Sequence, residues 1–245
     1  MALFTDGVVS GMEDLTAQDS QLASVASVEG IDVTQKLALA QDDLSLELGT
    51  LLARLSLQPD IGCVVITPAL KLWHTYRTLT LVYSDAYNNQ LNDRYAGKRD
   101  QFHRMAKQAY NKLIEIGIGM TTSPVPRAAT PSVAATVGGL PDGTYYVTMA
   151  WVNAAGEEGA AATPAVITTA ASTLLIEPGA APQTAAGWNV YAGADPNQMM
   201  IQNAAAIAPS EAWLQPPLLA TGGRGPGTGQ SPSYVQPVPR VIPRG

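Results

Sequence analysis

Residues 92–127 read NDRYAGKRDQFHRMAKQAYNKLIEIGIGMTTSPVPR, and this stretch decides how the chain is organised. A helix is predicted here, because its apolar residues fall on one side when successive residues are placed about 100° apart. Gly117 and Gly119 end the helix, and Pro124 and Pro126 prevent it from resuming, because proline lacks the N–H donor and favours an extended residue before it. We therefore expect the last helix of one domain and a bridge to the next. The apolar side consists of Tyr95, Phe102, Ala106, Ala109, Leu113 and Ile116.

Basic residues occupy most of the remaining perimeter of this helix. They are either an ordinary solvated face, partly balanced by Asp100 and Glu115, or a docking face for an acidic partner protein. Contact with DNA is less favoured, because the net charge is −6 and generic nucleic-acid binding needs an excess of Lys and Arg. The candidate interface residues on this helix are Arg94, Lys98, Arg99, Arg104, Lys107 and Lys112.

The residues before this stretch are also predicted to be helical. A loose apolar stripe over residues 12–30 predicts one helix that Gly30 ends. A stronger stripe begins after Asp32, which is a good N-cap with Gln35 at capping-box spacing. Leu39, Leu46 and Leu52 widen that stripe, so the helix at 32–57 is expected to touch several neighbours, in the same chain or in adjacent copies. The stripe itself consists of Val33, Leu37, Ala40, Leu44, Leu48, Leu51 and Leu55.

A further helix is predicted to start at Thr67-Pro68, with Thr67 as N-cap and Pro68 in the first helical position. Its aromatic stripe is interpreted as core in preference to a ligand platform. The sequence thus predicts four helices with short links, a helical bundle. The stripe consists of Trp73, Tyr76, Tyr83, Tyr87 and Leu91.

The composition changes after Arg127. Residues 1–127 hold 11 of the 14 Lys and Arg residues and 14 of the 20 Asp and Glu residues. Residues 145–152, YYVTMAWV, alternate with the period of a strand. Further strands are predicted at 163–169, 173–177 and from Gly187, with turns between them. About 90 residues of this kind predict a small β-sandwich of immunoglobulin-like or fibronectin-like type.

Residues 221–245 are rich in proline and glycine, which we expect to preclude regular helix or sheet. The segment is either a disordered tail or an extended arm that anchors on a neighbouring subunit. The candidate anchors are Tyr234, Val235, Val238, Val241 and Ile242. The predicted class is therefore α+β and multidomain: a helical domain over 1–127, a β-sandwich over 128–220 and an extended arm over 221–245.

No convincing catalytic, cofactor or metal site is present in the sequence, and we expect no enzyme. Cys63 is alone and lies in the apolar run IGCVVI, which favours a packed core thiol. His74 and His103 are interpreted as helix-surface or core-edge residues, and the adjacent Asp42 and Asp43 as solvated. We expect no secretory signal and no membrane helix, hence a soluble protein made in a cytoplasm.

Three segments together resemble the head–tail adaptor, or connector, proteins of tailed bacteriophages. They are MEDLTAQDSQLASVASVEGIDVTQKLALAQDDL, LNDRYAGKRDQFHRMAKQAYNKLIEIGIG and PVPRA, within about residues 10–127. NDRYAGKRDQFHRMAKQAY before a Gly-rich exit carries most of the likeness. The second half, with GTYYVTMAWVNAAGEEG and GWNVYAG, is similar to immunoglobulin-like or fibronectin-like modules appended to phage structural proteins. Such a module departs from the minimal adaptor.

The resemblance implies a structural virion protein at the neck, assembled in the host cytoplasm. It implies a homo-oligomeric, dodecameric ring that joins the portal protein to tail or neck proteins and surrounds viral DNA without reading its sequence. It also implies that the C-terminal segment reaches the portal. The alternative is a virion-mounted binding module, in which the β-sandwich recognises a host-surface ligand. A small hydrolase is a third hypothesis, under which His74 and His103 would be needed for activity.

Overall fold

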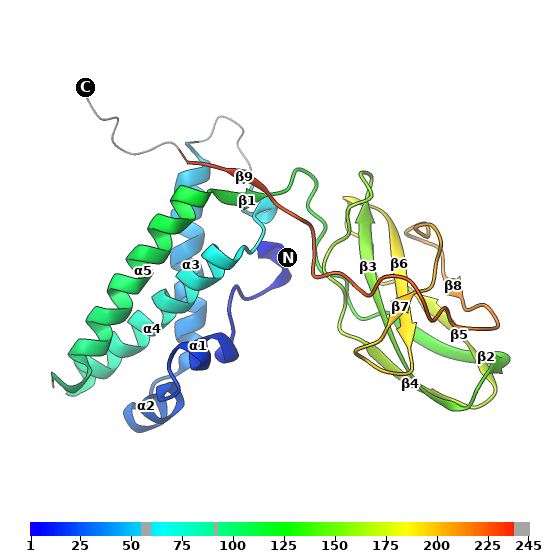
Figure 1. The fold of residues 1–245 in the computed structure, drawn as a ribbon, viewed down its shortest axis with the longest axis horizontal. Helices are drawn as coiled ribbons and strands as arrows, with labels where there is room; N and C mark the ends of the chain where they lie inside the picture. The colour runs from blue at the N-terminus through cyan, green and yellow to red at the C-terminus, as the bar shows by residue number, and fades with distance from the viewer. Residues whose placement is uncertain (55–59, 91–92, 238–245) are drawn as a thin grey trace. The chain divides into compact units, whose positions relative to one another are not determined.

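The computed structural model describes residues 1–54, 60–90 and 93–237 (Figure 1). Over these residues the chain forms five α-helices and nine β-strands, and the strand pairs are antiparallel. The predicted α+β class is therefore confirmed. The finer assignment to a helical bundle and an immunoglobulin-like sandwich stays a prediction. No helix in the described part of the chain has both the length and the apolar character that crossing a bilayer requires.

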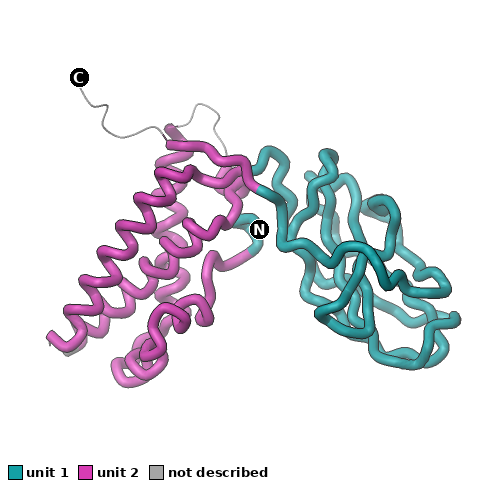
Figure 2. Tube along the Cα trace, in the orientation of Figure 1, with its two compact units in different colours: residues 1–6, 121–231 teal, residues 7–120, 232–245 magenta. Residues whose placement is uncertain are grey.

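The chain divides into two compact units (Figure 2). The helical unit consists of residues 7–120 and the described residues from Pro232 onward, and the β unit consists of residues 1–6 and 121–231. The predicted ranges 1–127, 128–220 and 221–245 differ from this division at both ends of the chain. The Met1 ammonium group donates a hydrogen bond to Thr228 Oγ1 at 2.7 Å, within the β unit. The last described strand pairs within the helical unit instead.

The predicted single helix over residues 12–30 is two helices, α1 (Met12–Gln18) and α2 (Leu22–Glu29). Asp19 between them has an extended backbone, and its carboxylate accepts a hydrogen bond from the Gln21 N–H at 3.1 Å. Such a local side-chain bond offers the backbone an alternative to helix, so the chain turns a corner here. Gly30 ends α2 with φ 66°, as predicted.

Three longer helices follow: α3 (Val33–Leu52), α4 (Pro68–Gln90) and α5 (Ala96–Ile116). Asp32 caps α3, because its carboxylate accepts hydrogen bonds from the Thr34 and Gln35 N–H groups. Thr67 precedes α4, and its hydroxyl accepts a hydrogen bond from the Leu70 N–H at 3.4 Å. Gly117, with φ 104°, ends α5. Short 3₁₀ turns form at Phe4–Asp6, Ile61–Cys63 and Asp93–Tyr95.

The leucine stripe of α3 is buried as predicted, apart from Leu55, which lies outside the described residues. Leu52 is also buried. Leu39 and Leu46, however, are 44% and 73% exposed on the opposite side of the helix. On α4 the aromatic stripe is core at Trp73, Tyr76 and Tyr83, Tyr87 is half-buried, and Leu91 lies outside the described residues.

The expectation that residues 221–245 form no regular sheet is wrong for β9 (Ser233–Val235). β9 pairs with β1 (Ile118–Met120), directly after α5, and Figure 1 shows the two strands side by side. Gly119 makes this approach possible, because a Cβ there would stand 2.6 Å from Thr67 Cγ2 and 2.9 Å from Pro232 Cβ. Ser233, Tyr234 and Val235 lie between Pro232 and Pro237 and include no proline, so their backbone N–H groups can take part in a ladder.

The β unit contains two antiparallel sheets. The three-stranded sheet has the order β2-β5-β8, and the four-stranded sheet has the order β4-β3-β6-β7. Side chains from both sheets form one apolar cluster, which includes Trp151, Leu174 and Trp188. The strand bounds are Ser132–Leu140 (β2), Gly143–Asn153 (β3), Ala165–Thr169 (β4), Ser172–Glu177 (β5), Ala185–Gly193 (β6), Met200–Ile201 (β7) and Trp213–Leu214 (β8).

Strand β3 is buried on both faces from Val147 to Asn153, although its sequence alternates. One face lines the apolar cluster. The other face packs with Tyr191 and Met199. The C-terminal segment covers this region: its Thr228 forms a β-bridge with Ala160, and its Gly227 carbonyl accepts a hydrogen bond from the Ala161 N–H. The segment predicted to be an arm is therefore part of the β unit as far as Ser231.

Candidate functional site

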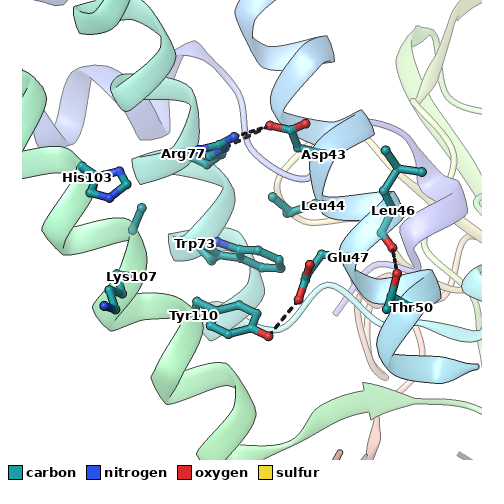
Figure 3. Close-up of a pocket in the computed structure, with 11 residues that line it drawn as sticks. Asp43, Leu44, Leu46, Glu47, Thr50, Trp73, Arg77, His103, Lys107 and Tyr110 are labelled. Atoms are coloured by element: carbon teal, nitrogen blue, oxygen red, sulfur yellow. Dashed lines mark hydrogen bonds and ion pairs between the residues drawn. The ribbon is translucent and has the colours of Figure 1, made fainter. Parts of the chain in front are cut away.

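An open groove of about 550 Å³ crosses the helical unit (Figure 3). Trp73 and Arg77 of α4 form its floor, and α3 and α5 form its walls. Figure 3 shows the Trp73 ring between Leu44 on one side and Tyr110 on the other. The Trp73 and Tyr110 rings are 5.0 Å apart at an interplanar angle of 60°, a favourable tilted geometry. The remaining lining residues are Asp43, Leu46, Glu47, Thr50, His103, Ala106 and Lys107.

The two walls of the groove carry opposite charge. Asp43 and Glu47 stand on α3, whereas Lys107 stands on α5. Arg77 binds Asp43 with an Nη2–Oδ2 distance of 2.6 Å, and the Tyr110 hydroxyl donates a hydrogen bond to Glu47 Oε1 at 3.0 Å. These two contacts hold the acidic wall to the floor and to α5. A groove with the aromatic ring of Trp73 between charged side chains suits a protein segment better than a small reactant.

The six predicted basic residues do not form one surface. Lys107 lines the groove, and Lys112 lines a smaller hollow between α4 and α5 beside Tyr76 and Met105. Arg104 is exposed on α5. Arg94 lies before α5, and its guanidinium is 5.3 Å from the Tyr95 ring centroid. The perimeter of a helix is too broad for residues spread around it to meet one partner.

Lys98 is committed to an interaction inside the unit. Its ammonium group lies 2.7 and 2.6 Å from the two carboxylate oxygens of Asp19, which is 6% exposed, and 5.2 Å from the Tyr83 ring centroid. The Tyr83 hydroxyl donates a hydrogen bond to Asp19 as well. Burial acts to raise the pKa of Asp19, but the hydrogen bonds from Lys98 and Tyr83 outweigh it, so the pKa lies below its ordinary value. The triad fixes the corner between α1 and α2.

Arg99 is also used within the unit. It binds Asp100 with an Nη2–Oδ1 distance of 2.9 Å, and its guanidinium lies 4.3 Å from the Tyr87 ring centroid. Lys98 and Arg99 flank the apolar side of α5, where a long side chain lies against neighbouring helices. The alternative of a solvated face partly balanced by Asp100 therefore agrees with Arg99, whereas Lys98 is paired with the buried Asp19.

The predicted arm anchors divide into two groups. Tyr234 is in β9 and is 48% exposed, and Val235 is half-buried. Both belong to a strand that pairs with β1 of the helical unit. Val238, Val241 and Ile242 lie outside the described residues. The expected contact with a neighbouring subunit stays a prediction.

His74 is a core residue with both ring nitrogens bonded. Nδ1 lies 2.7 Å from Ser10 Oγ and Nε2 lies 3.1 Å from the Leu37 carbonyl oxygen, so Nε2 donates to Leu37, and Nδ1 of the neutral ring accepts from Ser10. Burial lowers the pKa of His74, against the Leu37 hydrogen bond and the Asp14 charge. His103 is a surface residue, as expected. His74, predicted at a surface or core edge, is fully buried.

Cys63 is half-buried at the end of a 3₁₀ turn and is not the core thiol that the sequence predicted. Burial raises the pKa of its thiol, which keeps it from the reactive thiolate form. Within the residues that the structure describes, no group of three or more His, Cys, Asp or Glu side chains could hold a metal ion.

The β unit has a polar cluster that the sequence did not reveal. Glu158 binds Arg224 and accepts a hydrogen bond from the Tyr191 hydroxyl, while the Arg224 guanidinium lies 5.6 Å from the Tyr191 ring centroid. Burial and the bond to Glu158 raise the pKa of Tyr191. The cluster attaches the C-terminal segment to the four-stranded sheet, so Arg224 has a structural task.

Sequence reasoning also missed the groove. Its floor residue Trp73 belongs to a stripe interpreted as core, and Asp43 was interpreted as simply solvated. The available signal was the position of Leu46, which lies off the α3 stripe beside Glu47. A comparison with models of protein families finds no match for this chain, and a comparison with curated proteins finds none either.

Proposed function

We propose that the chain is a structural protein of a tailed-phage particle, an adaptor whose copies form a ring between portal and tail around the DNA channel. The resemblance of residues 10–127 to head–tail adaptors motivates the proposal. In this account the helical unit makes the contacts between copies, and the protein has no enzymatic task.

The observation that carries the proposal is the apolar surface on the outer side of α3. Leu46 is 73% exposed and Leu39 is 44% exposed, although the opposite side of the same helix is fully packed. Leu46 adjoins the open groove over Trp73. Removing apolar area from water stabilises association by about 25 cal/mol per Å², so large side chains beside a groove favour contact with another chain.

Charge supports a head-to-tail contact between copies. Asp42 of α3 and Arg104 of α5 are exposed residues of opposite charge on different helices of the unit, whereas Asp43 and Lys107 line the same groove and Asp43 is already bound to Arg77. Two different complementary surfaces make a heterologous contact, which closes into a ring when the rotation between copies permits.

We also propose the finer fold as part of this account. The helical unit is an adaptor-type bundle, and the β unit is a small sandwich of immunoglobulin-like or fibronectin-like type. Support for the sandwich comes from the antiparallel pairing and from the cluster that Trp151, Leu174 and Trp188 form between the two sheets.

Electron microscopy of particles assembled with and without this chain tests the function. We expect filled heads and separate tails when the chain is absent, and joined particles when it is restored. Tailed particles in normal numbers without the chain would contradict the adaptor function. Joined particles that lack only attachment to host cells would instead support the alternative of a virion-mounted binding module.

A further inference from the structure

Strand β2 forms an end of its sheet, and its stretch from Ser132 to Val137 contains no charge, proline or bulge. It pairs with β5 on one side, in continuous register from Ser132 to Val137, before an irregularity at Gly138 and Gly139. Residues 128–141 contain no charged side chain. Natural sheet edges are commonly blunted by charges, proline or bulges within the strand, because a free ladder attracts another strand.

The other end strands of the two sheets in the β unit are less open. β7 is followed on its outer side by the C-terminal segment, where the Ile201 N–H donates to the Arg224 carbonyl at 3.0 Å. β8 has two residues and is soon followed by Pro216 and Pro217. β4 is short and follows Pro164. β2 therefore offers the longest edge for pairing.

The direction of the free backbone groups in β2 can be derived from its neighbour. Leu174 of β5 accepts a hydrogen bond from the Gln215 N–H at 2.9 Å and donates its own N–H to the Gln215 side chain at 3.3 Å. Both backbone groups of Leu174 thus point away from β2. Ala135 opposes Leu174 in the ladder, so this pair exchanges no hydrogen bond, and the N–H and C=O of Ala135 point to the free edge.

The same alternation directs Val133 and Val137 outward with Ala135. These three positions lie in the sequence VAATV, residues 133–137, which is nearly the same read in either direction. An antiparallel pair of such strands centred on Ala135 places Ala135 opposite Ala135, and Val133 opposite Val137 on both sides. In this register, all three outward positions of each strand have a partner on the other strand.

We propose that β2 is an interface on which a second copy of this chain adds its own β2, antiparallel and centred on Ala135. Each outward backbone group then gains its partner. Val137, whose side chain is 97% exposed, is covered by Val133 of the second copy. The small residues Ala134, Ala135 and Thr136 keep side-chain bulk low, and the lack of charge removes the repulsion that identical strands often suffer.

This contact has a two-fold axis, whereas the ring contact proposed for the helical unit is head-to-tail. The inference goes beyond the adaptor function, and either can fail alone. Variants of β2 are expected to remove the strand pairing and to leave any ring contact in place.

Cysteine cross-linking in the full chain tests the register. In a Cys63→Ala background, Ala135→Cys is expected to give a disulfide-linked dimer under mild oxidation, because opposed residues in a ladder have Cα atoms about 5.5 Å apart. Val137→Cys alone is expected to stay unlinked, and a mixture of Val133→Cys with Val137→Cys is expected to link. An unlinked Ala135→Cys chain, or equal linking of Val137→Cys, would overturn the proposal.

A charge exchange at the same position gives an independent measurement. Ala135→Lys and Ala135→Glu each place like charges opposite each other and are expected to weaken pairing about tenfold or more in sedimentation experiments. A mixture of the two variants is expected to restore pairing. Val166→Lys, at an exposed valine of β4, is the matched control and should change nothing. Failure of the mixture to pair would count against a register that brings Ala135 opposite Ala135.

Discussion

At the scale of single residues, the basic side chains of α5 have different tasks. Lys98 neutralises a buried carboxylate, whereas Lys107 is exposed at the rim of the groove. Lys98→Met leaves Asp19 charged without its cation, which we expect to lower the free energy of unfolding by about 2–3 kcal/mol, reduced by the partial exposure of Lys98. Lys107→Met should change it by less than about 0.5 kcal/mol. Urea unfolding of both variants gives the comparison, and equal effects would contradict the assigned roles.

His74 gives a prediction about pH. Because burial lowers its pKa below the ordinary 6.5, the unfolded chain takes up a proton before the folded chain does as pH falls. The stability linked to the neutral ring is therefore present above pH 6.5 and is lost as pH falls below it. We expect His74→Phe to cost about 1–3 kcal/mol at neutral pH, from the lost bonds to Ser10 and Leu37, and less in acid.

Urea unfolding of the natural chain and the His74→Phe variant at about pH 7.5 and about pH 5.5 measures this difference. Groups with shifted pKa values that do not interact with His74, such as Asp19, titrate in both proteins and largely cancel. A gap between the two proteins that is the same at both pH values would show that His74 does not titrate on unfolding in this range.

At the scale of elements, the β1–β9 ladder depends on Gly119. Gly119→Ala adds a Cβ within 3 Å of Thr67 and Pro232, so we expect weaker β9 pairing and faster chymotrypsin cleavage at the half-exposed Tyr234. Gly49→Ala makes the same chemical change on α3, where a Cβ meets nothing within 4 Å. It should stabilise the chain by about 0.5–1 kcal/mol. Unchanged cleavage in Gly119→Ala would contradict the assigned role of the ladder.

The elements that the sequence predicted well have strong local signals. Asp32 and Thr67 accept hydrogen bonds from free N–H groups at the starts of α3 and α4, and Gly117 ends α5. Each effect depends on neighbouring residues alone. The corner at Asp19 was missed, because the bond from the Gln21 N–H to Asp19 is a weak local signal and Lys98, which holds the Asp19 carboxylate, is distant in sequence. β9 was missed because it forms only where β1 offers an edge.

The candidate site was less predictable for the same reason. Leu39 and Leu46 fall on the side of the helix opposite Leu37 at about 100° per residue, whereas the buried Leu52 falls near the stripe, so the spacing separates them but does not show what covers each. The groove needs residues of three helices, and the sequence does not say which helix faces which. The helix periodicity identified the basic residues of α5 without showing that Lys98 and Arg99 have partners inside the unit.

At the scale of the whole molecule, each compact unit contains residues from both halves of the sequence. The first residues belong to the β unit, which the second half mainly builds, and β9 belongs to the helical unit, which the first half mainly builds. Residues 1–6 complete the β unit, and β9 pairs within the helical unit. Truncating either end therefore removes part of a folded unit. Experiments on self-association should use the full chain for this reason.

The account depends most on the outer surface of α3 as a contact between copies. Leu46→Glu, and Leu39→Glu with it, should abolish that contact, whereas Val28→Glu on α2, also at an exposed apolar residue, should preserve it. The most direct measurement is the mass of the purified full chain by light scattering over a range of concentrations. We predict a closed oligomer of one size that the two leucine variants convert to smaller species. A chain that remains a monomer at every concentration would contradict the account.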